Sequence, residues 1–377
     1  MKVKAINSVS FKEILLKIEE MLVDFSPTLA IVYFDTLFDY KSLGAYLEQK
    51  EIQTIGTSTC GEICNDQNLS ESCSILFLDP KEDHFKIQIE KFEGDEFETA
   101  KKIALNAKEN FENPALITYA SKVGVNGDLV VKGYKEVLGK VAPIFGGLAG
   151  DNFRNDEFIV FSNNRFEPNG LVALVFDGNI IKLEGKSYSG WKELGRMHTV
   201  TKAQGNILHE IDNSPALEMF VQYFGIEKST SDDGTPLDVI PGIYPLKVIK
   251  DNEAEYLRSP LLYDKKNLSL ILAGEVNEGD KFKFCTMPDF ETVESTVKYF
   301  QKYSNSHQEI DAVVVNTCAA RKLAFGPMMN IEIKDIFNIW NVPMAGYMAM
   351  GEIGNNCKDD ICDFHNVTCS LLTLKEI

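Results

Sequence analysis

GTSTCGEI, the stretch from Gly56 to Ile63, recurs near the end of the chain as GYMAMGEI, from Gly346 to Ile353. Each copy follows an apolar run and ends in a glycine, a glutamate and an isoleucine. Because the surrounding segments recur in the same order, the pattern predicts an internal duplication.

The repeated unit is a strand, a helix, a second strand, the glycine-acid turn and a third strand. TLAIVYF, IQTIG and SCSILFL are the strands of the first copy, and DAVVVNTC, VPMAG and TCSLLTL take their places in the last. A looser copy between them contains PALITYA, APIFGGLAGD and GLVALVF, with Gly150-Asp151 in place of the Gly-Glu pair. We expect the last copy to be embedded in a second domain.

Strand and helix patterns alternate along the chain, which predicts an α/β or α+β protein with mixed sheets. The strand candidates are nine apolar runs at residues 28–34, 72–78, 85–92, 114–120, 170–176, 267–276, 280–287, 311–318 and 367–374. Helices are expected within residues 1–22, 40–50, 96–111, 127–139, 215–224, 289–303 and 332–340. Ser10 and Glu13 form a candidate capping box in the first of these helices.

The composition excludes several classes of partner. The 377 residues carry a formal net charge of −18, which repels nucleic acid and anionic membrane surfaces, although a small basic pocket can lie within this average. No run reaches the roughly 18–20 apolar residues of a membrane span, and the N-terminus lacks a signal-peptide pattern. Eight cysteines in a chain of this size are typical of free thiols in a reducing compartment, so we expect a cytoplasmic protein.

An ordered set of motifs carries a family resemblance. In order, GTSTCGEI, PIFGGLAGDN followed by NGLVALVF, TVTKAQGNILHEIDNSPALEMF, and VPMAGYMAMGEIG leading to FHNVTCSLLTL resemble the motifs of the FIST family of bacterial sensory proteins. The resemblance covers nearly the whole chain. It implies an N-terminal FIST domain at residues 1–188 and a C-terminal FIST domain at residues 189–377.

The resemblance also implies a role in signal transduction. FIST proteins are often fused to histidine kinases, cyclic-dinucleotide enzymes or chemotaxis-type domains, and they are proposed to bind small ligands such as amino acids. A subset is described as haem-binding nitric oxide sensors. Since no such output segment precedes the last residue, Ile377, we expect the output to belong to a separate signalling protein such as a histidine kinase, a cyclic-dinucleotide enzyme or a chemotaxis receptor. No resident cofactor is expected, with noncovalent haem as the alternative.

The glycine-acid turns are one candidate ligand site. The turn after the second strand lies at the carboxyl end of the sheet, where α/β proteins bind ligands. Glycine lets the backbone approach a ligand, and the acid can accept hydrogen bonds from it. The alternative is a tight turn with a capping acid. The residues expected at this site are Gly61, Glu62, Gly147, Asp151, Tyr347, Gly351 and Glu352.

NTCAARKLAFG, which follows a strongly apolar strand, is the other candidate, because Cys318 and Arg321 should emerge at the strand's end. Arginine binds carboxylates bidentately, so an amino acid could place its carboxylate on Arg321 and its ammonium group on Glu352 or Asp151. The alternative is that Arg321 pairs with a neighbouring acid on the surface. Arg321 would also lower the pKa of Cys318, which leaves a thiol-dependent enzyme open, but no recognisable spacing supplies a general base and we expect no catalysis.

The tail CKDDICDFHNVTC contains a second group of candidate ligands. Cys357, Cys362, His365 and Cys369 could supply four zinc ligands. Their spacing matches no common zinc motif, and His365 and Cys369 would lie about 13 Å apart on a strand, so we expect inert thiols and no metal. His365 and Asn366 match the His-Asn pair of the FIST family and are expected in the ligand site or in a buried network. If haem binds, His198 or His365 is the candidate axial ligand.

Overall fold

The computed structural model describes residues 1–122, 124–154, 156–225, 244–249 and 255–377. Helices alternate with mixed sheets, so the predicted α/β class is confirmed. All nine strand candidates coincide with strands, although the run at 267–276 forms only the short strand Ser269–Leu272. No helix in these described residues is long and apolar enough to cross a membrane.

Three copies of one unit build the larger part of the structure, which we call the body. The first copy contains β1 (Val3–Ser8), α1 (Phe11–Leu22), β2 (Leu29–Phe34), α2 (Tyr40–Gln49), β3 (Gln53–Ser58), β4 (Glu62–Cys64), β5 (Gln67–Leu69) and β6 (Cys73–Leu78). After a short 3-10 helix, Glu82–His84, the second contains β7 (Phe85–Lys91), α3 (Glu96–Asn110), β8 (Pro114–Ser121), α4 (Gly127–Leu138), β9 (Ile144–Leu148), β10 (Val160–Ser162), β11 (Arg165–Glu167) and β12 (Gly170–Asp177).

The third copy begins with β13 (Ile181–Tyr188) and is then interrupted. It resumes with α6 (Phe290–Ser304), β22 (Ala312–Cys318), α7 (Ala319–Phe325), α8 (Met328–Trp340), β23 (Met344–Ala349), β24 (Glu352–Asn355), β25 (Cys362–His365) and β26 (Cys369–Glu376). The duplication and its looser middle copy thus form a triplication, in which the third copy has one additional helix, α7.

Each copy forms the core of its own sheet. The second and third strands run parallel, as β2 and β3, β8 and β9, and β22 and β23. The last strand returns antiparallel to the second strand and also pairs with the first strand of its copy. The sequence pattern predicted this succession of strands and helices in mixed sheets, and the structure adds how the strands pair.

The two short strands of each copy leave their own sheet and extend another. The hairpin β4–β5 pairs with β23, the hairpin β10–β11 pairs with β3, and the hairpin β24–β25 pairs with β9. Each copy therefore completes the sheet of a different copy, and the three sheets form a closed ring. The buried residues Tyr33, Tyr119 and Tyr347 come from three different strands and pack together where the sheets meet.

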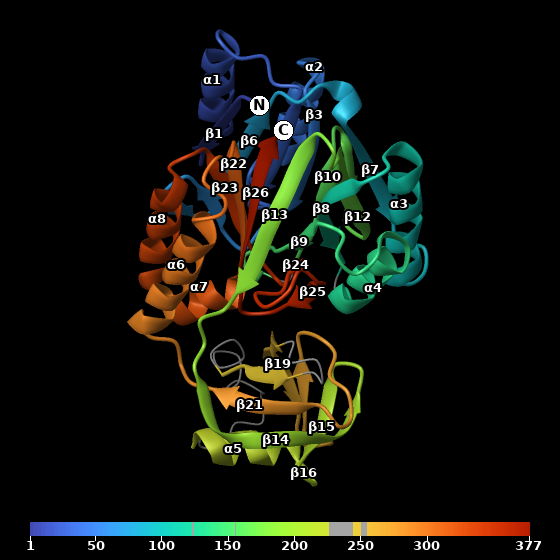
Figure 1. Cartoon of the computed structure of the whole chain (residues 1–377), viewed down its shortest axis with the longest axis vertical. Helices are drawn as coiled ribbons and strands as arrows, with labels where there is room; N and C mark the ends of the chain where they lie inside the picture. Colours follow the sequence, from blue (N-terminus) through green and yellow to red (C-terminus); the bar gives the residue numbers. More distant parts are fainter. Residues whose placement is uncertain (123, 155, 226–243, 250–254) are drawn as a thin grey trace.

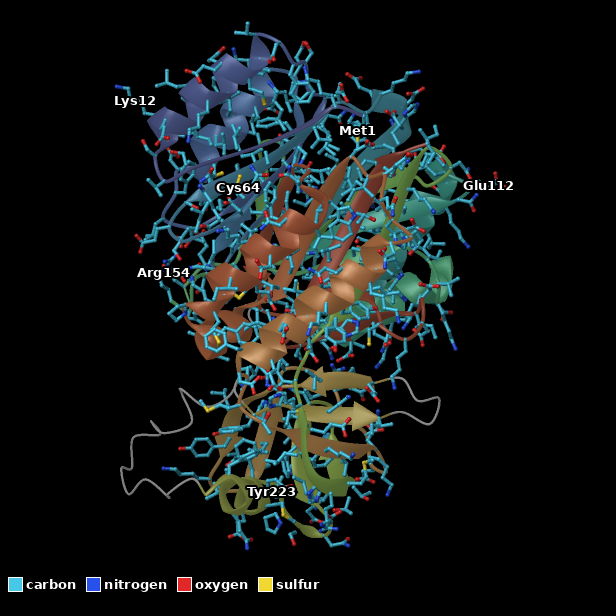
Figure 2. The ribbon with its side chains drawn as sticks, turned by 60° about the vertical axis from the view of Figure 1, so that its left-hand side comes forward. Met1, Lys12, Cys64, Glu112, Arg154 and Tyr223 are labelled. Atoms are coloured by element: carbon cyan, nitrogen blue, oxygen red, sulfur yellow. The ribbon has the colours of Figure 1, made fainter. Side chains whose placement is uncertain are left out.

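The interruption of the third copy is a small β-rich unit, which we call the insert (193–285). Its described elements are β14 (Glu193–Gln204), β15 (Ile207–Ile211), β16 (Ser214–Pro215), α5 (Ala216–Phe224), β17 (Leu246–Ile249), β18 (Glu255–Arg258), β19 (Pro260–Asp264), β20 (Ser269–Leu272) and β21 (Lys281–Cys285). It has its own apolar core, which includes Phe220, Phe282 and Phe284. Figures 1 and 2 show the insert below the body.

In space the chain divides differently from the predicted domains 1–188 and 189–377. β13 pairs with β26, and β23 pairs with β4, so residues 290–377 return to the body instead of forming a domain with the insert. The last copy is therefore part of the body and is not embedded in a second domain. Figure 1 shows the two chain ends close together at the top of the body.

The N-terminus also differs from its predicted helix, since Val3–Ser8 forms β1 and only Phe11–Leu22 is helical. Val3 and Ala5 pack against the core, which is the two-residue period of a strand. Ser10 makes no side-chain cap. Instead, the hydroxyl of Ser8 accepts from the amide of Ser10 at 3.0 Å and donates to Glu13 at 2.8 Å.

Candidate functional site

The glycine-acid turns meet one another inside the body. Each turn follows the third strand of its copy (β3, β9 or β23), and its backbone groups bond to the turns of other copies. Backbone hydrogen bonds of 2.8–2.9 Å run from Cys60 to Met348, from Met348 to Gly61, from Leu148 to Gly351 and from Gly150 to Ser58. The turns pack on each other because the hairpins that follow them cross to other sheets. Because the turns contact one another, this arrangement favours the interpretation as tight turns over that of a ligand-binding surface.

The first glycine of the copies is required by the close approach of the parallel strand beside it. A Cβ atom at Gly146 would lie 1.7 Å from the carbonyl oxygen of Thr118. A Cβ atom at Gly346 would lie 1.9 Å from the carbonyl oxygen of Val315. The glycine therefore recurs because the backbone packs closely within the sheet, and its recurrence does not indicate contact with a ligand.

The two glutamates tie each hairpin to the segment before the returning strand. One carboxylate oxygen of Glu352 accepts from the amide of Thr368 at 3.1 Å and from its hydroxyl at 2.7 Å. Glu62 accepts in the same way from Ser72, at 3.2 and 2.6 Å. Burial raises the pKa of Glu352 to about 8 and the pKa of Glu62 to about 7, although these hydrogen bonds act in the opposite sense.

Asp151 does not occupy the equivalent of these glutamates. In the sheet register Glu352 lies opposite Gly147 and Glu62 lies opposite Tyr347, whereas the matching position opposite Thr57 is Val160. Asp151 is buried in the loop before β10, where it accepts from the amide of Asp156 at 2.7 Å. The middle copy therefore has valine, not a carboxylate, at this position.

Tyr347 and Gly147 lie in the core between the sheets. The ring of Tyr347 stacks on Tyr33 with centroids 5.2 Å apart, and its hydroxyl lies 2.9 Å from where a Cβ atom of Gly147 would stand. Tyr347 has no exposed surface. These two residues stabilise the junction of the copies and are separate from the cavity described below.

Arg321 is completely buried and pairs with an acid. The alternative expectation for Arg321 was also an ion pair, but one on the surface, whereas this pair lies in the interior. Its guanidinium group bonds Glu332 of α8, which is also completely buried. It donates to the carbonyl oxygens of Ser189 at 2.6 Å and Val367 at 3.2 Å. It also lies 5.3 Å from the ring centroid of Trp191. A ligand carboxylate could reach Arg321 only if this cluster opened.

Cys318 lies beside this cluster and is buried as well. Burial raises the pKa of its thiol well above the usual range, and the nearby Glu352 acts in the same direction. A raised pKa is the opposite of activation by Arg321, so the structure gives the thiol-dependent alternative no support.

The cysteines of the tail face different surroundings. Cys362 donates to the carbonyl oxygen of Ile144 at 3.4 Å, and Cys369 packs in the apolar cluster around α6 and α8. Within the described ranges, no group of three or more His, Cys, Asp or Glu side chains is placed to hold a metal ion.

His365 and Asn366 belong to the segment that carries the bonds of Glu352 and Arg321. The Nε2 atom of His365 lies 3.0 Å from the carbonyl oxygen of Gly354, and burial lowers the pKa of this histidine to about 4. The amide of Asn366 donates to the carbonyl oxygen of His365 at 3.0 Å. Segment 365–368 thus connects most of the residues predicted in the C-terminal half, including Cys318, whose amide donates to Thr368.

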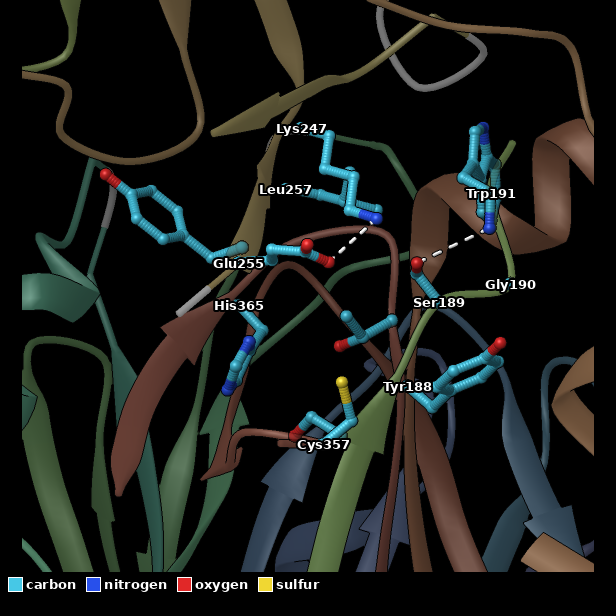
Figure 3. A pocket seen from close by; sticks show the side chains of 12 residues that line it. Tyr188, Ser189, Gly190, Trp191, Lys247, Glu255, Leu257, Cys357 and His365 are labelled. Atoms are coloured by element: carbon cyan, nitrogen blue, oxygen red, sulfur yellow. Dashed lines mark hydrogen bonds and ion pairs between the residues drawn. The ribbon is translucent and has the colours of Figure 1, made fainter. Parts of the chain in front are cut away.

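The same segment forms one wall of a cavity between the body and the insert. Three parts of the chain line this interdomain cavity (Figure 3): Ser187, Tyr188, Ser189, Gly190 and Trp191 at the end of β13; Lys247, Glu255, Tyr256 and Leu257 from the insert; and Cys357, His365 and Thr368 from the third copy. Its volume is about 80 Å³. Since a water needs roughly 10–15 Å³ of such space, the cavity has room for about half a dozen waters or one small organic molecule.

Arg321 supports this cavity from behind. The carbonyl oxygen that it binds belongs to Ser189, and the ring that it faces belongs to Trp191. Both residues line the cavity. Arg321 is therefore a positioning residue for the wall.

A row of alternating charges runs from the insert to the body beside the cavity. In order, the row is Lys283, Glu193, Lys247, Glu255 and Lys358, and its four N···O distances are 2.6, 2.9, 2.7 and 2.7 Å. Three lysines and two glutamates leave one positive charge. Figure 3 shows Lys247 and Glu255 paired at the cavity. The excess positive charge belongs to the row as a whole, because Lys247 and Glu255, the two members that line the cavity, balance each other.

The pKa shifts in the row follow from these contacts. Burial opposes the charged form of Lys247, but hydrogen bonds with Glu255 and Glu193 raise its pKa overall. Burial likewise opposes the charged form of Glu255, but Lys247 and Lys358 lower its pKa. Both groups are therefore charged at neutral pH.

Sequence reasoning missed Lys247, Glu255 and Trp191. The three segments that build the cavity are far apart in sequence, and no spacing within one segment indicates it. The only signal was general, because a small basic pocket can exist in a chain of high negative charge.

Both candidate haem ligands are buried. His198 lies inside the insert, with its Nδ1 atom 2.8 Å from Asp212 and its ring packed against Phe282 and Phe284. His365 touches the interdomain cavity, but its Nε2 atom is taken by Gly354.

The chain was compared with known protein families. The model of the FIST N domain matches residues 28–214, and the model of the FIST C domain matches residues 216–355. No curated protein was found to match the chain. The boundary between the two matches falls inside the insert, beside β16. With both domain models matched in order over most of its length, this chain belongs to the FIST family, whose domains are associated with the sensing of small ligands in signal transduction.

Proposed function

We propose that this protein is a sensor that binds a small carboxylate metabolite, such as an amino acid, in the interdomain cavity and acts on a separate signalling protein. One observation carries the proposal: the Lys247–Glu255 pair lines a small cavity at the junction of the two parts of the molecule. Membership in a sensory family supports the role.

The chemistry of the lining favours a zwitterion. Lys247 can hold a carboxylate by a charge-assisted hydrogen bond, and Glu255 can accept from an ammonium group. The ligand would replace the direct contact between these two side chains, so the charges remain paired. Trp191 and Leu257 offer apolar surface for the rest of the molecule. The small volume restricts the ligand to one with few heavy atoms.

In this proposal the carboxylate of the ligand binds Lys247 instead of Arg321, and Arg321 has a supporting role. Lys247 is 21% exposed, whereas Arg321 has no exposed side-chain surface. Opening the Arg321–Glu332 pair would leave a buried charge without a partner, which costs about 3–5 kcal/mol. A ligand at Lys247 avoids this cost, because its own charged groups replace the contact between Lys247 and Glu255.

We also propose which class of protein receives the signal. A histidine kinase, a cyclic-dinucleotide enzyme or a chemotaxis receptor would receive the signal, as the resemblance to the family implies. The sensory character of the family agrees with a protein that is not an enzyme. The buried thiol of Cys318 gives no support to thiol catalysis.

A thermal-shift screen tests the proposal. The purified protein is melted with a panel of amino acids, small carboxylates and amines that lack a carboxylate. A ligand that binds only the native state adds about 2.7 kcal/mol of stability at a hundredfold excess over its Kd, which raises the melting temperature measurably. We expect a class of small zwitterions to raise it and the matched amines to have no effect. If no carboxylate in the panel raises the melting temperature, the proposal is wrong.

A further inference from the structure

The insert is attached to the body by two neighbouring crossings. The chain enters the insert through residues 189–192 and leaves it through residues 286–289, as Figure 1 shows. The amide of Thr286 donates to the carbonyl oxygen of Lys192 at 2.9 Å, so the crossings lie side by side. The side chain of Lys192 also pairs with Asp289 at 2.9 Å. Two paired crossings at one edge have the geometry of a hinge.

Away from the crossings, a buried arginine fastens the insert to the body. Arg258 of β18 is 2% exposed and pairs with Asp128 at the start of α4, at 2.9 Å. It also donates to the carbonyl oxygen of Phe364 in β25, at 3.1 Å. The other oxygen of Asp128 accepts from the backbone amide of Glu275 at 2.9 Å. Asp128 and Phe364 belong to the body, whereas Arg258 and Glu275 belong to the insert.

The remaining contacts described between the two parts are mostly polar. Glu275 pairs with Lys132 at 2.6 Å and accepts from Asn126 at 2.9 Å. Glu255 pairs with Lys358 at 2.7 Å. Leu257 and Cys285 are apolar exceptions, since both pack in a cluster with residues of the body. Polar interfaces between domains of one chain typically permit relative motion, unlike large apolar ones.

The interdomain cavity lies between the hinge and this fastening. Its lining includes residues 187–191 at the hinge, Leu257 beside Arg258, and His365 beside Phe364. A rotation of the insert about the crossings would therefore change the cavity and break the Arg258–Asp128 pair together. A molecule held between the two parts would favour the closed arrangement.

We propose that the insert is a hinged domain that opens and closes over the interdomain cavity, with the Arg258–Asp128 ion pair as its latch. The hinge and latch stand without any ligand, whereas the idea that the ligand closes the hinge rests on the proposed function. When the latch is intact the insert is held closed. When the latch is broken, the buried charge that remains without its partner favours opening toward water.

Single-molecule energy transfer in the ligand-free protein tests the latch. Dyes are attached through non-natural amino acids at Lys108 of the body and Lys202 of the insert, both exposed, which avoids the eight native cysteines. The latch variant is Asp128→Asn. The matched control is Lys132→Met, which breaks the more exposed contact with Glu275 and leaves the latch in place.

We expect one dominant distance for the wild-type protein and for Lys132→Met, and a second, distinct population for Asp128→Asn. If Asp128→Asn folds poorly, Arg258→Lys is the second variant, because it keeps the charge but loses the planar fork that also reaches Phe364. A folded latch variant with the wild-type distance distribution would overturn the proposal. Because no ligand is added, that result would leave the thermal-shift test of the binding role unaffected.

Discussion

Replacing Arg321 by methionine should destabilise the protein strongly, because it leaves Glu332 buried without its partner. Both side chains have no exposed surface, and burial already raises the pKa of Glu332 more than Arg321 lowers it. Removing one partner of a buried ion pair costs about 3–5 kcal/mol. The loss of the bonds to Ser189 and Val367 acts in the same direction. We expect a fall in unfolding free energy within this range.

The assay is urea unfolding of the wild type, Arg321→Met and the double variant Arg321→Met with Glu332→Leu, followed by tryptophan fluorescence. The double variant removes both charges and replaces them with apolar groups of similar volume, which is often close to neutral. It should therefore recover at least half of the loss. A cost below about 1 kcal/mol for the single variant, or no recovery in the double, would refute the view that Arg321 is a buried structural cation.

Three further predictions follow from buried groups. Burial raises the pKa of Glu352 to about 8 in the folded protein, so its stabilising contribution is fully present below its unfolded pKa of 4.5 and is lost as pH rises through about 8. Glu352→Gln should therefore flatten this part of a melting-temperature profile from pH 5 to 9. An unchanged slope would contradict the raised pKa. The thiol of Cys318 should resist alkylation at pH 7 until the protein unfolds, as followed by mass spectrometry of the labelled peptide, and rapid labelling of the native protein would reopen the enzyme alternative. Haemin titration should give no Soret change that depends on His365, because its Nε2 atom is bound to Gly354; loss of a Soret band in His365→Ala, with retention in His307→Ala, would show the opposite.

The parts of the fold that follow local periodicity could be predicted from the sequence. The strands at 28–34, 114–120 and 311–318 are continuous apolar runs because they are buried on both faces, and the helices between them carry clear apolar stripes. The short strands of the hairpins, such as Glu62–Cys64 and Glu352–Asn355, could not be predicted. Each has few residues and finds its partner strand in another copy, so its stability comes from pairing that no local pattern records.

The same exchange of hairpins explains why the candidate site was predicted only in part. A glycine-acid turn at the carboxyl end of a sheet is open to a ligand when its sheet stands alone. Here the turns of three copies cover one another, and Glu62 and Glu352 bond to their own chain. Among the residues expected at a site, His365 lines the interdomain cavity and Arg321 lies directly behind it. Lys247 could not be found because only the docking of the insert brings it to the body.

Binding of the zwitterion that gives the largest thermal shift, measured by titration calorimetry in two lysine variants, tests the central claim most directly. Lys247→Met removes the cation that lines the cavity, and Lys283→Met removes its neighbour in the sheet, which pairs with the same Glu193 but does not line the cavity. A hydrogen bond to a charged group contributes about 1.5–3 kcal/mol, so Lys247→Met should weaken binding by about 10- to 100-fold. Lys283→Met should bind within a factor of about three of the wild type. Equal affinities in all three proteins would show that the ligand does not bind at Lys247.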